Sequence, residues 1–205
     1  MPIRDDKWFD FSGKGNHGTI IGATWTAKGR LGPSLSFDGV DDYVEVPHSA
    51  SLTSPVNGIT VMAWIKCSVL GTFKRIAGKD FWSEGFIFRI EAENRLMTRL
   101  WFTDDTSTPE LEALYIDDLL WHQVAFTFDT TTGKVIHYKD ALTTYAWTGY
   151  AGKKIKWGTG KLSISGGTDG FDGFIDEVRI YNRALTAEEI EAHFLGARVP
   201  IVRQL

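Results

Sequence analysis

The sequence predicts an all-β fold with antiparallel strands, and three observations support this prediction. Short runs rich in β-branched and aromatic residues recur along the chain. Clusters of Gly, Asn, Asp, Ser and Thr separate these runs, as turns between antiparallel strands require. The 205 residues are 43% apolar and 13% aromatic, which suffices for one full hydrophobic core. We therefore expect a single domain over residues 1–205, with a core over about 8–196 and a tail over 197–205.

Ten runs are long enough and apolar enough to be strands. Glu93-Asn94 joins two of them as a tight hairpin, and the loop 129–133 ends in a glycine that allows a positive φ. The expected strands are Ser34–Phe37, Tyr43–Val46, Ile59–Cys67, Arg75–Gly78, Phe86–Ala92, Arg95–Phe102, Trp121–Asp129, Val135–Lys139, Lys161–Ser165 and Phe174–Tyr181.

One segment near the C-terminus departs from the β pattern. Thr186 is a good N-cap, and Glu189 three positions later completes a capping box. Ile190 and Phe194 follow at helical spacing, and Gly196 is a suitable stop. The pattern predicts a helix of about two to three turns.

Charge and cysteine content exclude several classes of function. The formal charge of −4 and the pI near 5.7 leave no basic surface for phosphates, so we expect neither nucleic acid nor a membrane as partner. No stretch approaches the roughly 18 apolar residues of a membrane span. Cys67 is the only cysteine and lies in an apolar run, so we expect it to be buried as a small hydrophobic side chain.

Five stretches together resemble the laminin G-like domains of the concanavalin A-like lectin/glucanase superfamily. The resemblance implies a two-sheet antiparallel jelly-roll sandwich with one short C-terminal helix. It also implies ligand binding by loops at one end of the sandwich or by its concave face, usually of glycans, with structural calcium common. The matching stretches are residues 10–18, 35–44, 59–66, 121–129 and 175–185.

Two features differ from the usual pattern of these domains. Relatives begin with an apolar strand before the first block, but residues 1–9 contain an Asp5-Asp6-Lys7 run. The first strand is therefore expected to be short, displaced or supplied by a neighbouring chain. Relatives often have Asn-Gly in the hairpin after the central strands, where this chain has Asp140-Ala141, which leaves the turn type open.

Oxygen-rich, glycine-flanked turns suggest a calcium site, because Ca²⁺ takes six to eight oxygen ligands. Asp176 is a lone carboxylate in an apolar strand and needs a partner, either a cation or Arg179. In relatives an ion often ties the N-terminal region to the last strand. The alternative is that Asp41-Asp42 only form a turn and that Asp176 pairs with Arg179. The predicted metal ligands are Asp10, Asp38, Gly39, Asp41 and Asp176.

Catalytic patterns are missing from the sequence. The Glu-x-Asp-x-x-Glu strand that β-glucan hydrolases of the superfamily use does not occur, and Glu91-Ala92-Glu93 fits a solvated hairpin end better. The five histidines never pair at i, i+2 or i, i+4, which disfavours a zinc site. We therefore predict that the chain is not an enzyme.

Eight tryptophans are more than one sandwich core needs. Trp64 and Trp121 lie in strong strand patterns and are expected to be structural. Other aromatic residues lie in Gly- and Thr-rich connections, where exposed rings stack well on sugars. The alternative is that these rings cap the sandwich or meet a partner subunit. The predicted ligand-binding residues are Trp82, Tyr145, Trp147, Tyr150 and Trp157.

These observations favour a non-catalytic, lectin-like domain that binds a glycan or polysaccharide and is stabilised by Ca²⁺. The alternative is a virion surface, tail or adhesion component that uses the fold for assembly and host contact, as a homo-oligomer or larger assembly. Either function places the domain outside the cell or on a virion surface. The apolar tail Val199–Leu205 is expected to dock on the sandwich or on another chain.

Overall fold

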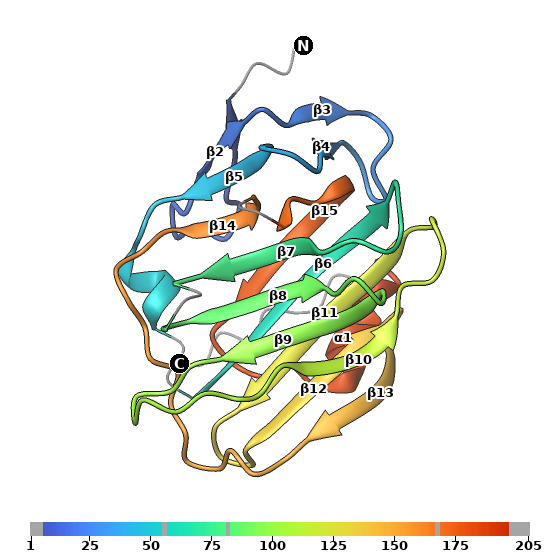
Figure 1. Ribbon diagram of the computed structural model, residues 1–205. Coiled ribbons are helices and arrows are strands. Elements are labelled where there is room, and N and C mark those ends of the chain that lie inside the picture. The colour runs from blue at the N-terminus through green and yellow to red at the C-terminus, as the bar shows by residue number, and fades with distance from the viewer. Residues whose placement is uncertain (1–5, 55–56, 81–82, 167–168, 197–205) are drawn as a thin grey trace.

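The computed structural model describes residues 6–54, 57–80, 83–166 and 169–196. Two antiparallel sheets pack face to face, which confirms the predicted jelly-roll sandwich (Figure 1). One sheet has eight strands in the order β1-β2-β5-β14-β7-β8-β9-β10, and the other has seven in the order β13-β12-β11-β6-β15-β4-β3. The tail 197–205 and Trp82 lie outside the described residues.

All ten predicted strands are present, and the described residues form five more. Their bounds, with one 3₁₀ turn and one helix, are β1 (Lys7–Trp8), β2 (Gly18–Ile21), β3 (Thr24–Thr26), β4 (Ser34–Asp38), β5 (Tyr43–Val46), η1 (Ala50–Thr53), β6 (Gly58–Cys67), β7 (Lys74–Lys79), β8 (Phe86–Ile90), β9 (Arg95–Leu100), β10 (Leu111–Tyr115), β11 (His122–Asp129), β12 (Lys134–Lys139), β13 (Leu142–Trp147), β14 (Leu162–Ser165), β15 (Asp172–Tyr181) and α1 (Ala187–Phe194).

The main core lies between the two sheets and is built by alternation. Phe86 and Phe88 on β8 face Phe126 on β11, with ring centroids 5.7 and 5.2 Å apart. All three rings are buried, because alternate residues of a strand point to the same face of its sheet, here the face turned toward the other sheet. Cys67 is buried too, as the sequence predicts.

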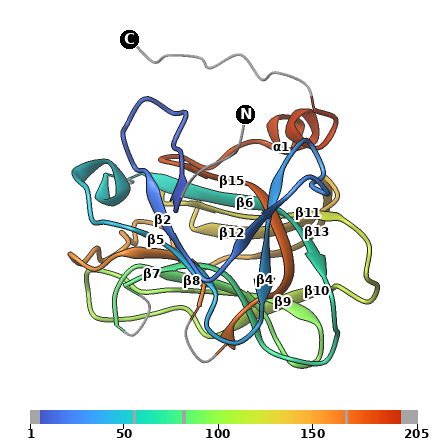
Figure 2. The same ribbon diagram turned by 90° about the horizontal axis from the view of Figure 1, so that it is seen from above.

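The predicted capping box is present at the start of α1. The Glu189 N–H donates to Thr186 Oγ1, and the Thr186 N–H donates to the Glu189 carboxylate. The helix lies on the outer face of the seven-stranded sheet (Figure 2). Ile190 is fully buried there, and the Phe194 ring stacks on Trp64 at 5.4 Å. Trp64 is therefore structural, but it is held between sheet and helix rather than between the sheets.

Two open questions about the chain are resolved. The first strand is short, because β1 has only two residues and pairs with β2. The Asp140-Ala141 turn has φ values of 52° and 67°, which are those of a type I′ hairpin turn.

Candidate functional site

Charged residues gather on the outer face of the eight-stranded sheet, on and beside strands β7 to β10. These four strands are neighbours in the sheet (Figure 1). Along each strand, residues that point outward alternate with core residues. Across the strands, Arg75 on β7 pairs with Arg89 on β8, and Arg89 pairs with Met97 on β9. The loop before β15 adds a further carboxylate. We call this surface the arginine–carboxylate face and define it by Arg75, Arg89, Arg95, Arg99, Glu91, Glu110, Glu112 and Asp169.

Several of these charges are buried although they lie outside the core. Arg75, Glu91 and Asp169 are each only 5–6% exposed. Burial raises the pKa of Glu91, while its hydrogen bond from Arg89 acts in the opposite direction. Burial also lowers the pKa of Arg75, against the attraction of Asp169. Such groups are held in place by one another, since each buried charge needs its partner.

Arg89 is the centre of this network. Its Nε donates to Glu91 at 2.6 Å, and its other nitrogens lie 3.6 Å from Asp169 and 3.7 Å from Glu110. Its guanidinium also lies 5.2 Å from the centre of the Phe73 ring, which is about half exposed. The face therefore combines fixed donors, fixed acceptors and an exposed aromatic ring.

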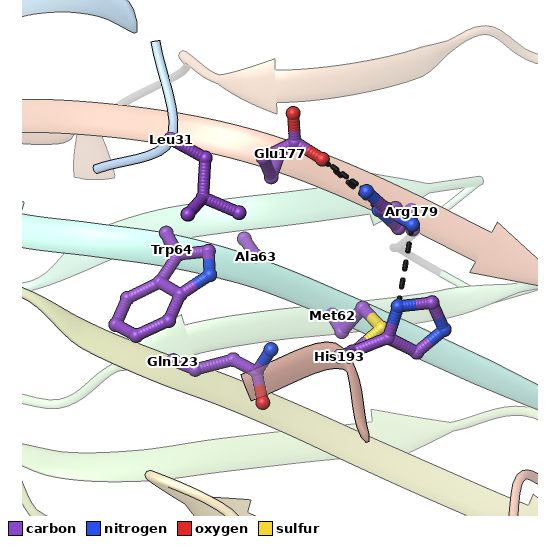
Figure 3. Close-up of a pocket in the computed structure, with 8 residues that line it drawn as sticks. All are labelled: Leu31, Met62, Ala63, Trp64, Gln123, Glu177, Arg179 and His193. Atoms are coloured by element: carbon purple, nitrogen blue, oxygen red, sulfur yellow. Dashed lines mark hydrogen bonds and ion pairs between the residues drawn. The ribbon is translucent and has the colours of Figure 1, made fainter. Parts of the chain in front are cut away.

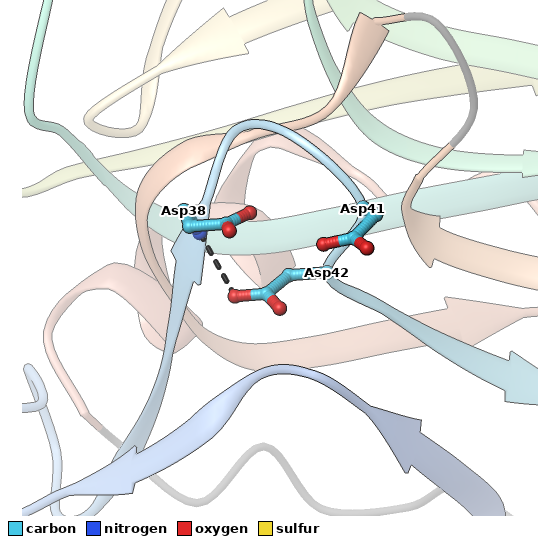
Figure 4. A group of neighbouring side chains, drawn as sticks. All are labelled: Asp38, Asp41 and Asp42. Atoms are coloured by element: carbon cyan, nitrogen blue, oxygen red, sulfur yellow. Dashed lines mark hydrogen bonds between the residues drawn. The ribbon is translucent and has the colours of Figure 1, made fainter.

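A second acidic group lies in the turn between β4 and β5 (Figure 4). The carboxylate oxygens of Asp38, Asp41 and Asp42 all come within 4.8 Å of one another. Asp42 is only 9% exposed, and burial together with its two acidic neighbours raises the pKa of its carboxyl group. Carboxylates this close to one another offer the hard oxygen ligands that Ca²⁺ prefers, so these residues fit a calcium ion.

Two glycines allow this turn to be so compact. A Cβ at Gly22 would lie 2.0 Å from Asp42 Oδ1, and a Cβ at Gly39 would lie 2.8 Å from the Asp172 Cβ. Both glycines have positive φ values, 75° and 77°. Gly39 therefore allows the turn its backbone conformation, which only glycine adopts without strain.

A shallow pocket of about 210 Å³, including solvent at its mouth, lies beside α1 on the outer face of the other sheet (Figure 3). Trp64, Gln123, Arg179 and His193 are among the residues that line it. Gln123 Oε1 is buried with no hydrogen-bond partner among the described residues, and the pocket has room for about one water molecule to supply one. The pocket is therefore too small for a sugar in this conformation.

The sequence model of the concanavalin A-like lectin/glucanases superfamily matches residues 38–191, well over half of the chain. The chain belongs to this superfamily. No curated protein sequence matches it.

Solved structures with the same fold include binding domains of bacterial toxins. The binding domain of Paraclostridial Mosquitocidal Protein 1 has a TM-score of 0.75 at 16% identity, over 94% of this chain and 50% of that one. The Botulinum Neurotoxin serotype G binding domain gives 0.70 at 14%, over 91% and 47%. The heptameric SAP-like pentraxin from Limulus polyphemus gives 0.58 at 16%, over 78% and 80%. The chain spans about half the length of the two toxin domains, and identities this low show the fold alone.

The lectin-like fold separates the predicted metal ligands. Asp38, Gly39 and Asp41 share one turn with Asp42, which sequence reasoning did not single out. Asp10 lies in the loop between β1 and β2, where it accepts hydrogen bonds from the Ser12 and Asn16 N–H groups. That loop precedes Gly18, whereas the other end of β2, Ile21, pairs with Tyr43 beside the acidic turn. Asp10 is therefore a loop-forming residue at the opposite end of β2.

Asp176 is also away from the turn, and the predicted ion pair between Asp176 and Arg179 is wrong. Its Oδ2 accepts hydrogen bonds from the Arg30 and Leu31 N–H groups at 2.9 and 3.1 Å, and its Oδ1 accepts one from the Glu177 N–H. Arg179 pairs with Glu177 instead. Burial raises the pKa of Asp176 despite these backbone donors. The carboxylate fixes the loop before β4, a long-range contact that no local motif predicts.

Most of the predicted ligand-binding aromatic residues pack inward. Tyr145 and Trp147 are on β13, a strand that sequence reasoning interpreted as a connection. The Trp147 ring lies 4.8 Å from buried His137, Tyr150 lies 5.8 Å from Phe102, and Trp157 also packs against the main core. Tyr145 remains 55% exposed. It is thus the one described member of the predicted set whose ring is mainly in solvent.

No helix in the described part of the chain is long and apolar enough to cross a membrane. The described helix, α1, has eight residues.

Proposed function

We propose that this domain binds carbohydrate without catalysis, outside the cell or on a virion surface, through the arginine–carboxylate face. The observation that carries the proposal is the burial of paired charges on an outward sheet face, beside the exposed ring of Phe73. Buried ion pairs contribute little net stability, and apolar residues of similar volume often replace them at no loss. Their presence away from the core therefore favours a role in recognition.

The chemistry of the face suits sugars. A hydroxyl group both donates and accepts, so it binds well where a guanidinium and a carboxylate lie side by side. Arg89 with Glu91 and Arg95 with Glu112 are such pairs. Hydrogen bonds to charged groups contribute about 1.5–3 kcal/mol each. Phe73 supplies an apolar ring against which the C–H face of a sugar packs.

The proposal excludes hydrolysis for a chemical reason. Glycosidases need one carboxylic acid and a second carboxylate on opposite sides of the scissile bond. On this face Glu91 is tied to Arg89, and Glu112 is tied to Arg95 at 2.9 Å. Each of these carboxylates is thus held against a guanidinium on the sheet face, so neither is placed as one member of a pair that flanks a glycosidic bond.

A glycan array followed by titration calorimetry tests the function. We expect binding to at least one glycan, lost in Phe73→Ala and Arg89→Lys and retained in Tyr145→Ala. Tyr145 is the matched control, because its ring is about as exposed as that of Phe73 but lies on the edge strand β13. Binding that survives both face variants and disappears in Tyr145→Ala would place the site on β13. An array with no signal would overturn the proposal.

Assembly is the second candidate function. Phe11 is 94% exposed and Phe9, two positions before it, is 47% exposed, so this loop presents two apolar rings that suit contact with a partner chain. Sedimentation velocity measures the oligomeric state. A closed oligomer that dissociates in Phe11→Ser would favour assembly. A monomer at all concentrations would rule out assembly and leave carbohydrate binding as the only proposed function.

A further inference from the structure

Glu110 occupies an unusual position on the arginine–carboxylate face. Its Oε1 lies 3.7 Å from an Arg89 nitrogen and 3.9 Å from an Arg99 nitrogen. Both distances are too long for direct hydrogen bonds. The Glu110 side chain is also 45% exposed, unlike the buried carboxylates beside it. Glu110 therefore faces two guanidinium groups across gaps that a bridging oxygen atom would close.

A hydroxyl group fits such a gap. Its oxygen accepts a hydrogen bond from an N–H group of Arg89 or Arg99, and its O–H donates a hydrogen bond to the Glu110 carboxylate. We propose that Glu110, Arg89 and Arg99 bind a hydroxyl group of an uncharged sugar, an inference that rests on the proposed carbohydrate function. Glu110 is then a specificity-determining residue, because its carboxylate accepts a hydrogen bond from a sugar hydroxyl group and repels an acidic sugar.

The balance of charge on the face decides between uncharged and acidic sugars. Four arginines meet four carboxylates, and the close pairs are Arg75–Asp169, Arg89–Glu91 and Arg95–Glu112. An acidic sugar needs a guanidinium that no carboxylate already engages. Here its charge would lie close to Glu110 with no surplus positive charge to balance it. The whole chain adds a net charge of −4.

The test compares glycans that differ only in charge. Neutral oligosaccharides and their sialylated, sulfated or uronic-acid counterparts are titrated into the purified chain by calorimetry. We expect neutral glycans to bind, with an affinity that changes less than about twofold between low and high salt, since no net charge is neutralised. Acidic counterparts should bind at least about tenfold more weakly.

Glu110→Gln tests the residue itself. The amide keeps the shape but loses the charged acceptor, so affinity for the neutral glycan should fall about tenfold, the effect of one hydrogen bond to a charged group. Discrimination against acidic glycans should shrink at the same time. Glu191→Gln is the matched control, because Glu191 is exposed on α1 over the opposite sheet. It should leave both affinities unchanged.

The outcomes separate the inference from the function on which it rests. Tight binding of acidic glycans, or an unchanged affinity in Glu110→Gln, would overturn the inference while carbohydrate binding stands. Absence of binding to every glycan would overturn both. Equal melting temperatures of Glu110→Gln and the parent chain show that a lost affinity is not a folding defect.

Discussion

His137 and Thr98 are hydrogen-bonded across the interior of the sandwich, with 2.8 Å between Nε2 and Oγ1. The bond joins β12 of one sheet to β9 of the other. His137 is completely buried, and its Nδ1 has no hydrogen-bond partner among the described residues. A second proton on the ring would make it a buried cation with no carboxylate in the described part of the chain to pair it, and burial accordingly lowers the pKa of His137 to about 3.

This relationship predicts a loss of stability in mild acid. Below the ordinary His pKa of 6.5, the unfolded chain binds a proton at His137 that the folded chain does not bind until about pH 3. The free energy of unfolding should therefore decrease as the pH is lowered through this window, by up to about 1.4 kcal/mol per pH unit. Urea unfolding between pH 5 and 6.5 measures it. His137→Gln should flatten the slope, and exposed His48→Gln should not; equal slopes in all three chains would contradict the prediction.

His122 should act in the opposite direction. Its Nδ1 lies 2.6 Å from Asp140 and its Nε2 lies 2.9 Å from Asp118. The hydrogen bond to Asp140, helped by Asp118, raises the pKa of His122. The stability it contributes is fully present below the unfolded pKa of about 6.5 and is lost as pH rises through the folded value. Unfolding from pH 6 to 9 should show a decline that His122→Gln lacks, and a decline of the same size in that variant would rule out this residue.

The Asp140-Ala141 turn predicts a stabilising substitution. Ala141 has a φ of 67°, a region that costs an L-residue with a Cβ roughly 1 kcal/mol. Ala141→Gly should raise the free energy of unfolding by about 0.5–1 kcal/mol, measured by urea denaturation. Ala146→Gly on the neighbouring strand β13 is the control and should lower it, because glycine weakens a strand interior. A loss of stability in Ala141→Gly would show that the turn is not strained.

The two aromatic residues of β13 should differ in kind. Trp147 contacts His137 and packs against the core, so Trp147→Ala should lower the free energy of unfolding by about 2–4 kcal/mol. Tyr145 is mainly exposed, and Tyr145→Ala should change it by less than about 1 kcal/mol. Thermal or urea unfolding of the two variants compares them directly. Similar, small effects would mean that Trp147 is free to bind a ligand.

These residues show what the sequence was able to predict. Strands such as β6 and β11 bury nearly every side chain, so their continuous apolar runs identify them without help from the fold. The strand β13, Leu-Thr-Thr-Tyr-Ala-Trp, lacks that signal because its register shifts at a bulge and breaks the alternation. Its aromatic side chains therefore looked like loop residues.

The candidate site was less predictable for a different reason. Arg89 and Arg99 alternate with core residues and match an ordinary solvated strand face. Only the strand order places them beside Glu110, and only the loop before β15 brings Asp169 to Arg75. The acidic turn is predictable from the sequence, because its carboxylates are close together in the chain. Asp176 was not, because its partners lie 145 and 146 positions away.

The acidic turn gives the last prediction, which concerns calcium. Asp38, Asp41 and Asp42 repel one another as ionised groups, and the raised pKa of Asp42 reflects its burial beside the other two carboxylates. A bound Ca²⁺ would replace that repulsion with ligation. Because an ion bound only by the folded state stabilises it by mass action, free calcium at 100 times the dissociation constant should add about 2.7 kcal/mol.

Melting curves in EDTA and in excess calcium measure this effect on protein shown to be metal-free at the start. We expect a higher Tm with calcium, and Asp41→Asn should abolish the difference, since Asp41 is an exposed ligand whose loss leaves the fold intact. Asp176→Asn is the decisive control. The sequence alone places Asp176 in the metal site, whereas the structure ties it to the Arg30 and Leu31 N–H groups. Asp176→Asn should therefore lower the Tm in both conditions and keep the calcium response. A calcium response that is lost in Asp176→Asn and kept in Asp41→Asn would place the ion on the last strand. Identical melting curves in EDTA and in calcium would exclude the site, because an ion that binds only the folded state must raise its stability.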